Sequence, residues 1–102
     1  MTNIEEITQE IIRFRDQRKW KKFHTPKNLA LSVIIETGEL FEIFQWLSDD
    51  EIYSKLEEEK DHLSDELADI AIYLFSLANV LEVNLEEAIR IKLKKNAKKY
   101  PV

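Results

Sequence analysis

The chain has 102 residues and a formal net charge of −5, which suits a single domain and argues against general nucleic-acid binding. Its 44% hydrophobic and 34% charged residues are typical of a folded chain, and no apolar run reaches the roughly 18–20 residues that span a membrane. Cysteine is absent, which excludes disulfides and thiol chemistry, and the opening MTNIEEITQE lacks the regions of a signal peptide, so we expect a cytoplasmic protein.

One glycine and two prolines leave little turn chemistry, which predicts long helices joined by short connections. No segment alternates polar and apolar residues for long enough to form a strand, so the predicted fold class is all-α. Start signals for three helices are Thr2 with Glu5, Thr25 before Pro26, and Asn84 with Glu87. The four main helices are expected at about 3–21, 26–47, 55–81 and 84–99, with a short helical piece around 50–55.

The two middle helices carry more apolar surface than one packing partner covers. The polar positions of residues 26–47 fall within an arc of about 120° at 100° per residue, and most of 70–81 is apolar. A four-helix chain of this size has too little structure to cover two such helices. We therefore expect a homo-oligomer, a two-fold dimer in the simplest case or a tetramer.

Charge is spread unevenly along the chain. Residues 49–66 hold nine acids against Lys55 and Lys60, whereas the last helix is basic. Solvated helix faces explain most such charges. A more specific interpretation places the basic end of the chain near bound phosphates.

Two acidic pairs lie where the sequence turns apolar: Glu36 with Glu39, and Glu66 with Asp69. Each pair is spaced i, i+3 and so lies on one helix face, where like charges disfavour the helix by a few tenths of a kcal/mol. If the two helices pack antiparallel, the four carboxylates converge. A set of oxygen ligands with this charge suits a hard divalent cation, Mg²⁺ or Mn²⁺.

The spacing alone leaves two other interpretations open. Acidic i, i+3 pairs are common on solvated faces, so the chain can also be a helical interaction module without enzymatic activity. Glu59 and His62 form the Glu-x-x-His pair that di-iron bundles use twice, but the pair occurs only once here. His62 is therefore predicted to be an exposed helix residue.

The order of these motifs resembles a known family. ETGE at 36–39 followed by ELAD at 66–69 is similar to the paired ExxE…ExxD pattern of the all-α nucleoside triphosphate pyrophosphohydrolases, which include the MazG-like proteins and dCTP pyrophosphatases. The resemblance covers nearly the whole chain. It extends to WKKFHTPKNL at 20–29, GELFEIFQW at 38–46, DELADIAIYL at 65–74 and KLKKNAKKYPV at 92–102.

This resemblance implies a MazG-like four-helix bundle that hydrolyses an NTP or dNTP between its α- and β-phosphates, giving a monophosphate and pyrophosphate. Glu36, Glu39, Glu66 and Asp69 would be the Mg²⁺ ligands and catalytic residues, and Glu39 would take the proton of the attacking water. The expected role is the cleaning of nucleotide pools, with dCTP or a related dNTP as substrate. Gly38 is expected to let the opposing acidic pair come near.

The resemblance also predicts where the substrate is held. Aromatic residues near residues 20–24 and at the end of the second helix would contact the nucleoside. Residues of the basic last helix would contact the phosphates or the nucleoside. Ile11, Ile12 and the short connection after residue 46 depart from the dCTP pyrophosphatases and leave the base open. The predicted substrate-binding residues are Trp20, Phe23, His24, Trp46, Tyr73, Lys92, Asn96 and Lys99.

Overall fold

The computed structural model describes residues 3–102, and every regular element in this range is helical, which confirms the all-α prediction. None of the described helices is long and apolar enough to cross a membrane. The elements in chain order are α1 (Asn3–Gln17), the short 3-10 helix η1 (Lys21–Phe23), α2 (Pro26–Phe44), α3 (Asp49–Ser54), α4 (Leu56–Val80) and α5 (Leu85–Lys99).

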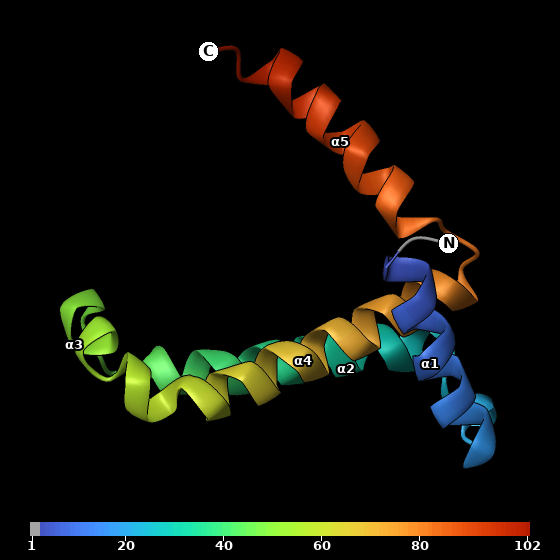
Figure 1. Cartoon of the computed structure of the whole chain (residues 1–102), viewed down its shortest axis with the longest axis horizontal. Helices are drawn as coiled ribbons and strands as arrows, with labels where there is room; N and C mark the ends of the chain where they lie inside the picture. Colours follow the sequence, from blue (N-terminus) through green and yellow to red (C-terminus); the bar gives the residue numbers. More distant parts are fainter. Residues whose placement is uncertain (1–2) are drawn as a thin grey trace.

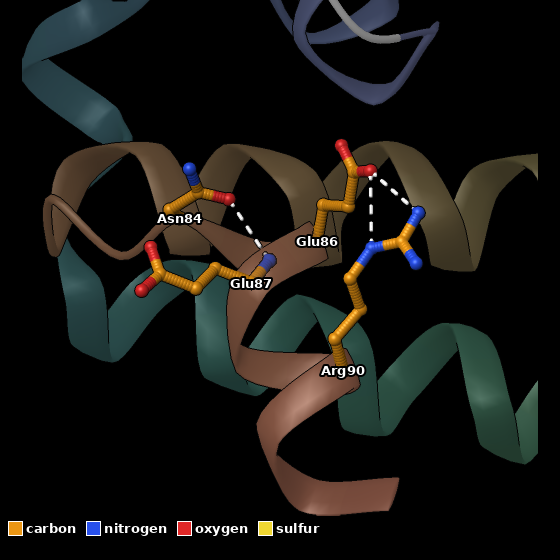
Figure 2. Close-up of polar contacts among 4 residues, drawn as sticks. All are labelled: Asn84, Glu86, Glu87 and Arg90. Carbon is orange, nitrogen blue, oxygen red and sulfur yellow. Dashed lines mark hydrogen bonds and ion pairs between the residues drawn. The ribbon is translucent and has the colours of Figure 1, made fainter.

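Side-chain caps begin three of the helices. Thr25 Oγ1 accepts a hydrogen bond from the backbone N–H of Asn28 (3.3 Å) at the start of α2. Ser48 and Glu51 form a reciprocal capping box before α3. Asn84 Oδ1 accepts from the N–H of Glu87 (3.0 Å) at the start of α5 (Figure 2). The caps predicted for α2 and α5 are therefore confirmed, whereas Thr2, predicted to cap the first helix, lies outside the described residues.

The first helix is shorter than predicted, since it ends at Gln17 rather than near residue 21. Lys19 has a left-handed backbone with φ of 58°. The N–H of Lys19 donates to the carbonyl of Asp16 (3.1 Å), and the N–H of Trp20 donates to that of Arg15 (3.1 Å). This is a Schellman motif, which ends a helix and usually places glycine at the left-handed position. Because lysine rather than glycine occupies position 19, the usual sequence signal for the end of a helix is missing here.

The same device ends α4. Glu82 has φ of 57°, its N–H donates to the carbonyl of Asn79 (3.0 Å), and the N–H of Val83 donates to that of Ala78 (2.9 Å). The chain then turns directly into α5. Both helix ends therefore place a residue with a Cβ in a conformation that costs about 1–2 kcal/mol.

The long helices α2 and α4 lie side by side and antiparallel, joined through α3 at one end, and α1 packs on α4 at the other (Figure 1). Helix α5 leaves the end of α4 and projects away, so it does not close a bundle with the other described helices (Figure 1). The radius of gyration is 16.4 Å, against about 13 Å for a compact chain of this length. Among the described apolar side chains, only Leu29 and Leu63 are buried.

We expect Glu82→Gly to stabilise the protein by about 0.5–1 kcal/mol, because glycine adopts the left-handed conformation without the Cβ clash but is more flexible when unfolded. Denaturant unfolding at a fixed protein concentration measures the difference. Lys60→Gly, in the exposed interior of α4, is the matched control and should lose about 1 kcal/mol. Equal losses in both variants would contradict the role assigned to Glu82.

Candidate metal centre

The antiparallel packing of α2 on α4 brings three of the predicted carboxylates together. Glu36, Glu39 and Glu66 each present an oxygen atom, and these atoms all lie within 4.8 Å of one another. Ligands on opposite sides of one divalent cation lie about 4–5 Å apart, since metal–oxygen distances are about 2.0–2.6 Å. The three side chains are thus spaced to share one ion.

The environment of Glu66 also fits a cation. Its side chain is 15% exposed, and its Oε2 is buried without a hydrogen-bond partner among the described residues. Burying a carboxylate oxygen removes its hydrogen bonds to water. This costs free energy unless the oxygen is protonated or a positive charge lies beside it. The donor set of three carboxylates is the kind that Mg²⁺ or Mn²⁺ accepts.

Glu36 shows the electrostatic consequence of this arrangement. Burial is the main cause that raises its pKa above the ordinary value, and a hydrogen bond that its protonated form donates to Glu39 raises it further. The negative charges of Glu39, Asp69 and Glu66 act in the same direction. The acids therefore repel one another in the metal-free protein, and a divalent ion would relieve that repulsion.

Asp69 and Tyr73 border the three carboxylates. Asp69 is not part of the group formed by the oxygens of the three glutamates. Its charge nevertheless raises the pKa of both Glu36 and Tyr73. Burial is the larger cause of the raised pKa of Tyr73, followed by the charges of Glu36, Asp69 and Glu39. The phenol therefore lies beside the acids and keeps its proton at neutral pH.

His62 is a neighbour of the site that the sequence analysis did not assign to it. Its Nε2 lies 3.7 Å from Glu66 Oε1, and its Nδ1 lies 3.4 Å from Glu59 Oε2. The i, i+4 spacing of His62 and Glu66 was the available signal. Among residues 3–102, the group of three or more side chains that can share a metal ion consists of Glu36, Glu39 and Glu66 and does not include His62. The di-iron alternative therefore gains no support.

A hollow extends from this point toward the end of α2. Trp46 lies on its wall with 85% of its surface exposed, which leaves the indole ring free to contact a planar group. The walls mix apolar, acidic and basic side chains. Its lining residues are Glu42, Ile43, Trp46, Leu47, Lys55, Glu59 and His62.

The predicted residues of the α1–α2 connection lie elsewhere. Pro26, where α2 begins, is ten residues before Glu36, or about 15 Å along the helix axis. Trp20 packs edge-on against Phe14, with ring centroids 5.9 Å apart. Burial lowers the pKa of His24, and the nearby Arg15 guanidinium lowers it further, which favours the neutral form of the ring. Its Nδ1 is buried without a hydrogen-bond partner among the described residues.

The residues of the last helix that are predicted to contact the substrate are also apart from the acids within one chain. Lys92, Asn96 and Lys99 lie on α5, which projects away from the α2–α4 pair (Figure 1). No lysine or arginine of the described residues is among the charges that shift the pKa of Glu36. A single chain thus assembles the acids, Tyr73 and the Trp46 hollow but not the other predicted contacts.

The expectation for Gly38 is wrong within the chain. A Cβ built at this position meets nothing within 4 Å, so the glycine does not let the acidic pair of α4 come near. The oxygens of Glu36, Glu39 and Glu66 come together without a contribution from Gly38, which is exposed.

Comparisons with known proteins identify the family of the chain. The profile of the MazG-like family matches residues 31–102. The chain is 40% identical to dCTP pyrophosphatase 1 of Bos taurus over 101 residues, which is 97% of this chain and 60% of that protein. The human dCTP pyrophosphatase 1 is 38% identical over 100 residues, 96% of this chain and 59% of that protein. The chain thus spans about three fifths of the length of these curated relatives.

A solved structure gives the same result for the fold. The crystal structure of a pyrophosphatase from Archaeoglobus fulgidus superposes with a TM-score of 0.94 at 48% sequence identity. The match covers 100% of this chain and 95% of the other. Together with the family profile, this likeness shows that the chain belongs to the MazG-like family.

Proposed function

We propose that the protein is a Mg²⁺-dependent nucleoside triphosphate pyrophosphohydrolase that cleaves dCTP or a related dNTP between the α- and β-phosphates. The observation that carries the proposal is the group formed by Glu36, Glu39 and Glu66, with a buried oxygen of Glu66 that lacks a partner. The names of the relatives, dCTP pyrophosphatase and pyrophosphatase, support the reaction class.

Each residue near the group has a role that follows from its position. Glu36, Glu39 and Glu66 would hold the ion, with Mn²⁺ as a substitute, and Asp69 would complete the set from the same face of α4. A bound divalent ion supplies charge neutralisation at the phosphates and orients water. Glu39, the most exposed of the three, would take the proton of the attacking water. Tyr73 keeps its proton and would donate it in a hydrogen bond to a phosphate oxygen.

The hollow beside the acids suits the nucleoside. The exposed ring of Trp46 offers a stacking surface that accepts any base. Glu42 and Glu59 line the same hollow and can accept a hydrogen bond from an amino group, as carboxylates do from the N4 amine of cytosine. These two carboxylates favour a base with an amino group, such as cytosine, over uracil.

The proposal includes a homo-oligomer that works on cytoplasmic nucleotide pools. Twenty-one large hydrophobic side chains are exposed among the described residues, which is more than a monomer of this size leaves in water. These surfaces also fit the alternative of an interaction module without enzymatic activity. The partnerless oxygen of Glu66 favours the enzyme, because an interaction module has no use for a buried, repelling carboxylate group.

We expect Glu36→Gln and Glu66→Gln each to reduce pyrophosphate release from dCTP by at least about 100-fold. Loss of a residue that only hydrogen-bonds to a metal ligand already reduces metal affinity or activity by about 10–100-fold. Glu57→Gln, on the exposed first turn of α4, is the control and should keep full activity. A panel of NTPs and dNTPs, assayed for pyrophosphate and orthophosphate separately, fixes the base and the bond. Orthophosphate as the first product would rule out α–β cleavage.

We expect Glu36→Gln to raise the stability of the metal-free protein at pH 7. The folded-state pKa of Glu36 is raised, so its ionised form opposes folding above that pKa, and this penalty disappears as the pH falls below the unfolded value of about 4.5. Saturating Mg²⁺ should raise the melting temperature of the natural protein but not that of the variant. An equal Mg²⁺ effect on both proteins would contradict a site at Glu36.

A further inference from the structure

His62 lines the hollow and also faces the three carboxylates, yet the proposed reaction gives it no role. Its ring lies on the wall of the hollow together with Trp46, and its Nε2 lies 3.7 Å from Glu66 Oε1. The side chain is 57% exposed, so small ions reach the ring directly from water. A histidine nitrogen directed at a carboxylate is the kind of pair that binds divalent metals.

The contact with Glu59 determines which nitrogen of the ring is free. Nδ1 of His62 lies 3.4 Å from Glu59 Oε2, so the neutral ring that satisfies this contact carries its proton on Nδ1 and donates it to the carboxylate. Nε2 then carries a lone pair. Histidines that bind metals use this arrangement, because the nitrogen away from the ion donates its proton to a carboxylate or a carbonyl group.

The lone pair of His62 Nε2 and the oxygen of Glu66 then face each other as two acceptors. Such a pair is repulsive unless a proton or a cation lies between the two atoms. Zinc binds histidine nitrogen and carboxylate oxygen at about 2.0–2.2 Å, which places the two ligand atoms about 3.4 Å apart at the tetrahedral angle. The observed separation of 3.7 Å therefore fits one shared ion after a small rotation of either side chain.

The surroundings of this pair favour a cation and distinguish it from the group of three glutamates. Glu42 and Glu59 lie on the wall of the hollow against one cationic side chain, Lys55, so the local charge is negative. Mg²⁺ prefers oxygen ligands, whereas imidazole suits ions such as Zn²⁺, Ni²⁺ and Cu²⁺. His62 and Glu66 are four residues apart on α4, and the helix holds both on one face.

We propose that His62 Nε2 and Glu66 Oε1 form a second cation site on α4, selective for divalent ions that accept nitrogen ligands, Zn²⁺ in the first place. Glu59 would orient the ring through Nδ1, and water from the hollow would complete the coordination. The site itself does not depend on nucleotide hydrolysis.

A consequence for Mg²⁺ follows from the shared carboxylate and rests on the proposed metal centre. Glu66 belongs to both the pair and the group of three glutamates. Zn²⁺ at His62 would place two positive charges beside the Mg²⁺ ligands and repel a second divalent ion. Zn²⁺ would therefore raise the Mg²⁺ concentration that the protein needs.

The imidazole NMR signals of the metal-free protein test the site without any variant. The chain has two histidines, and Zn²⁺ should shift the ring signals of His62 while those of His24 stay in place. Unchanged His62 signals at saturating Zn²⁺ would mean that the ring only donates hydrogen bonds to its two carboxylates, and would overturn the proposal. A shift at His24 alone would do the same.

Zn²⁺ affinity, measured by calorimetry in a Glu36→Gln background that disrupts the group of three glutamates, isolates the second site. Adding His62→Gln should weaken Zn²⁺ binding at least about tenfold, since the loss of an outer partner of a ligand already costs 10–100-fold. Asp61→Asn is the matched control, because it alters an exposed neighbour on α4 and leaves the pair intact. Equal Zn²⁺ affinity with and without His62 would refute the site.

The effect on Mg²⁺ is read from melting temperatures. Zn²⁺ should move the Mg²⁺-dependent rise in melting temperature to higher Mg²⁺ concentrations in the natural protein, and His62→Gln should lose most of this displacement. An equal displacement in both proteins would place the competition at the three glutamates and contradict the role of His62. Zn²⁺ binding at His62 without pyrophosphate release would leave the second site standing and overturn the proposed function, whereas pyrophosphate release without such binding would do the reverse.

Discussion

The contact on which the rest of the structure depends is the antiparallel packing of α2 on α4. This pairing aligns the ETGE segment with the ELAD segment, so acids that are thirty residues apart in the sequence share one small volume. The same contact shields Glu66 from water and raises the pKa of Glu36. A pair of amphipathic helices thus creates a strong negative field at a point where the packing alone would prefer apolar side chains.

The surrounding chain does little to stabilise this pair by itself. Few apolar side chains are buried, and helix α5 projects away from α2 and α4 (Figure 1). The Asn84 cap and the ion pair of Arg90 Nη2 with Glu86 Oε1 (3.0 Å, Figure 2) are contacts within the start of α5 itself. Exposed ion pairs of this kind contribute about 0.3–0.5 kcal/mol each. If a second copy covers the apolar surfaces that one chain exposes, as proposed, the stability of the protein would depend on association.

The fold was largely predictable from the sequence because its signals are local. Threonine and asparagine caps and the long apolar helices defined the elements, whereas the end of α1 was missed because Lys19 occupies a position that glycine normally marks. The convergence of Glu36, Glu39 and Glu66 followed from helix spacing and an assumed antiparallel pairing. The position of His62 beside Glu66 was readable from the same spacing. What the sequence could not supply was the path of α5, since the direction of a helix after a short turn depends on backbone angles rather than on composition.

That turn has a further consequence. The chain passes from α4 to α5 through Leu81–Asn84, where Glu82 is left-handed and the N–H groups of Leu81, Glu82 and Val83 are all hydrogen-bonded to α4. A connection this short and this well bonded has few alternative conformations, so the direction of α5 is set when the chain folds. The projecting helix is then a preorganised arm rather than a flexible tail. Ordering it on contact with another molecule costs little conformational entropy, which favours rapid and specific association.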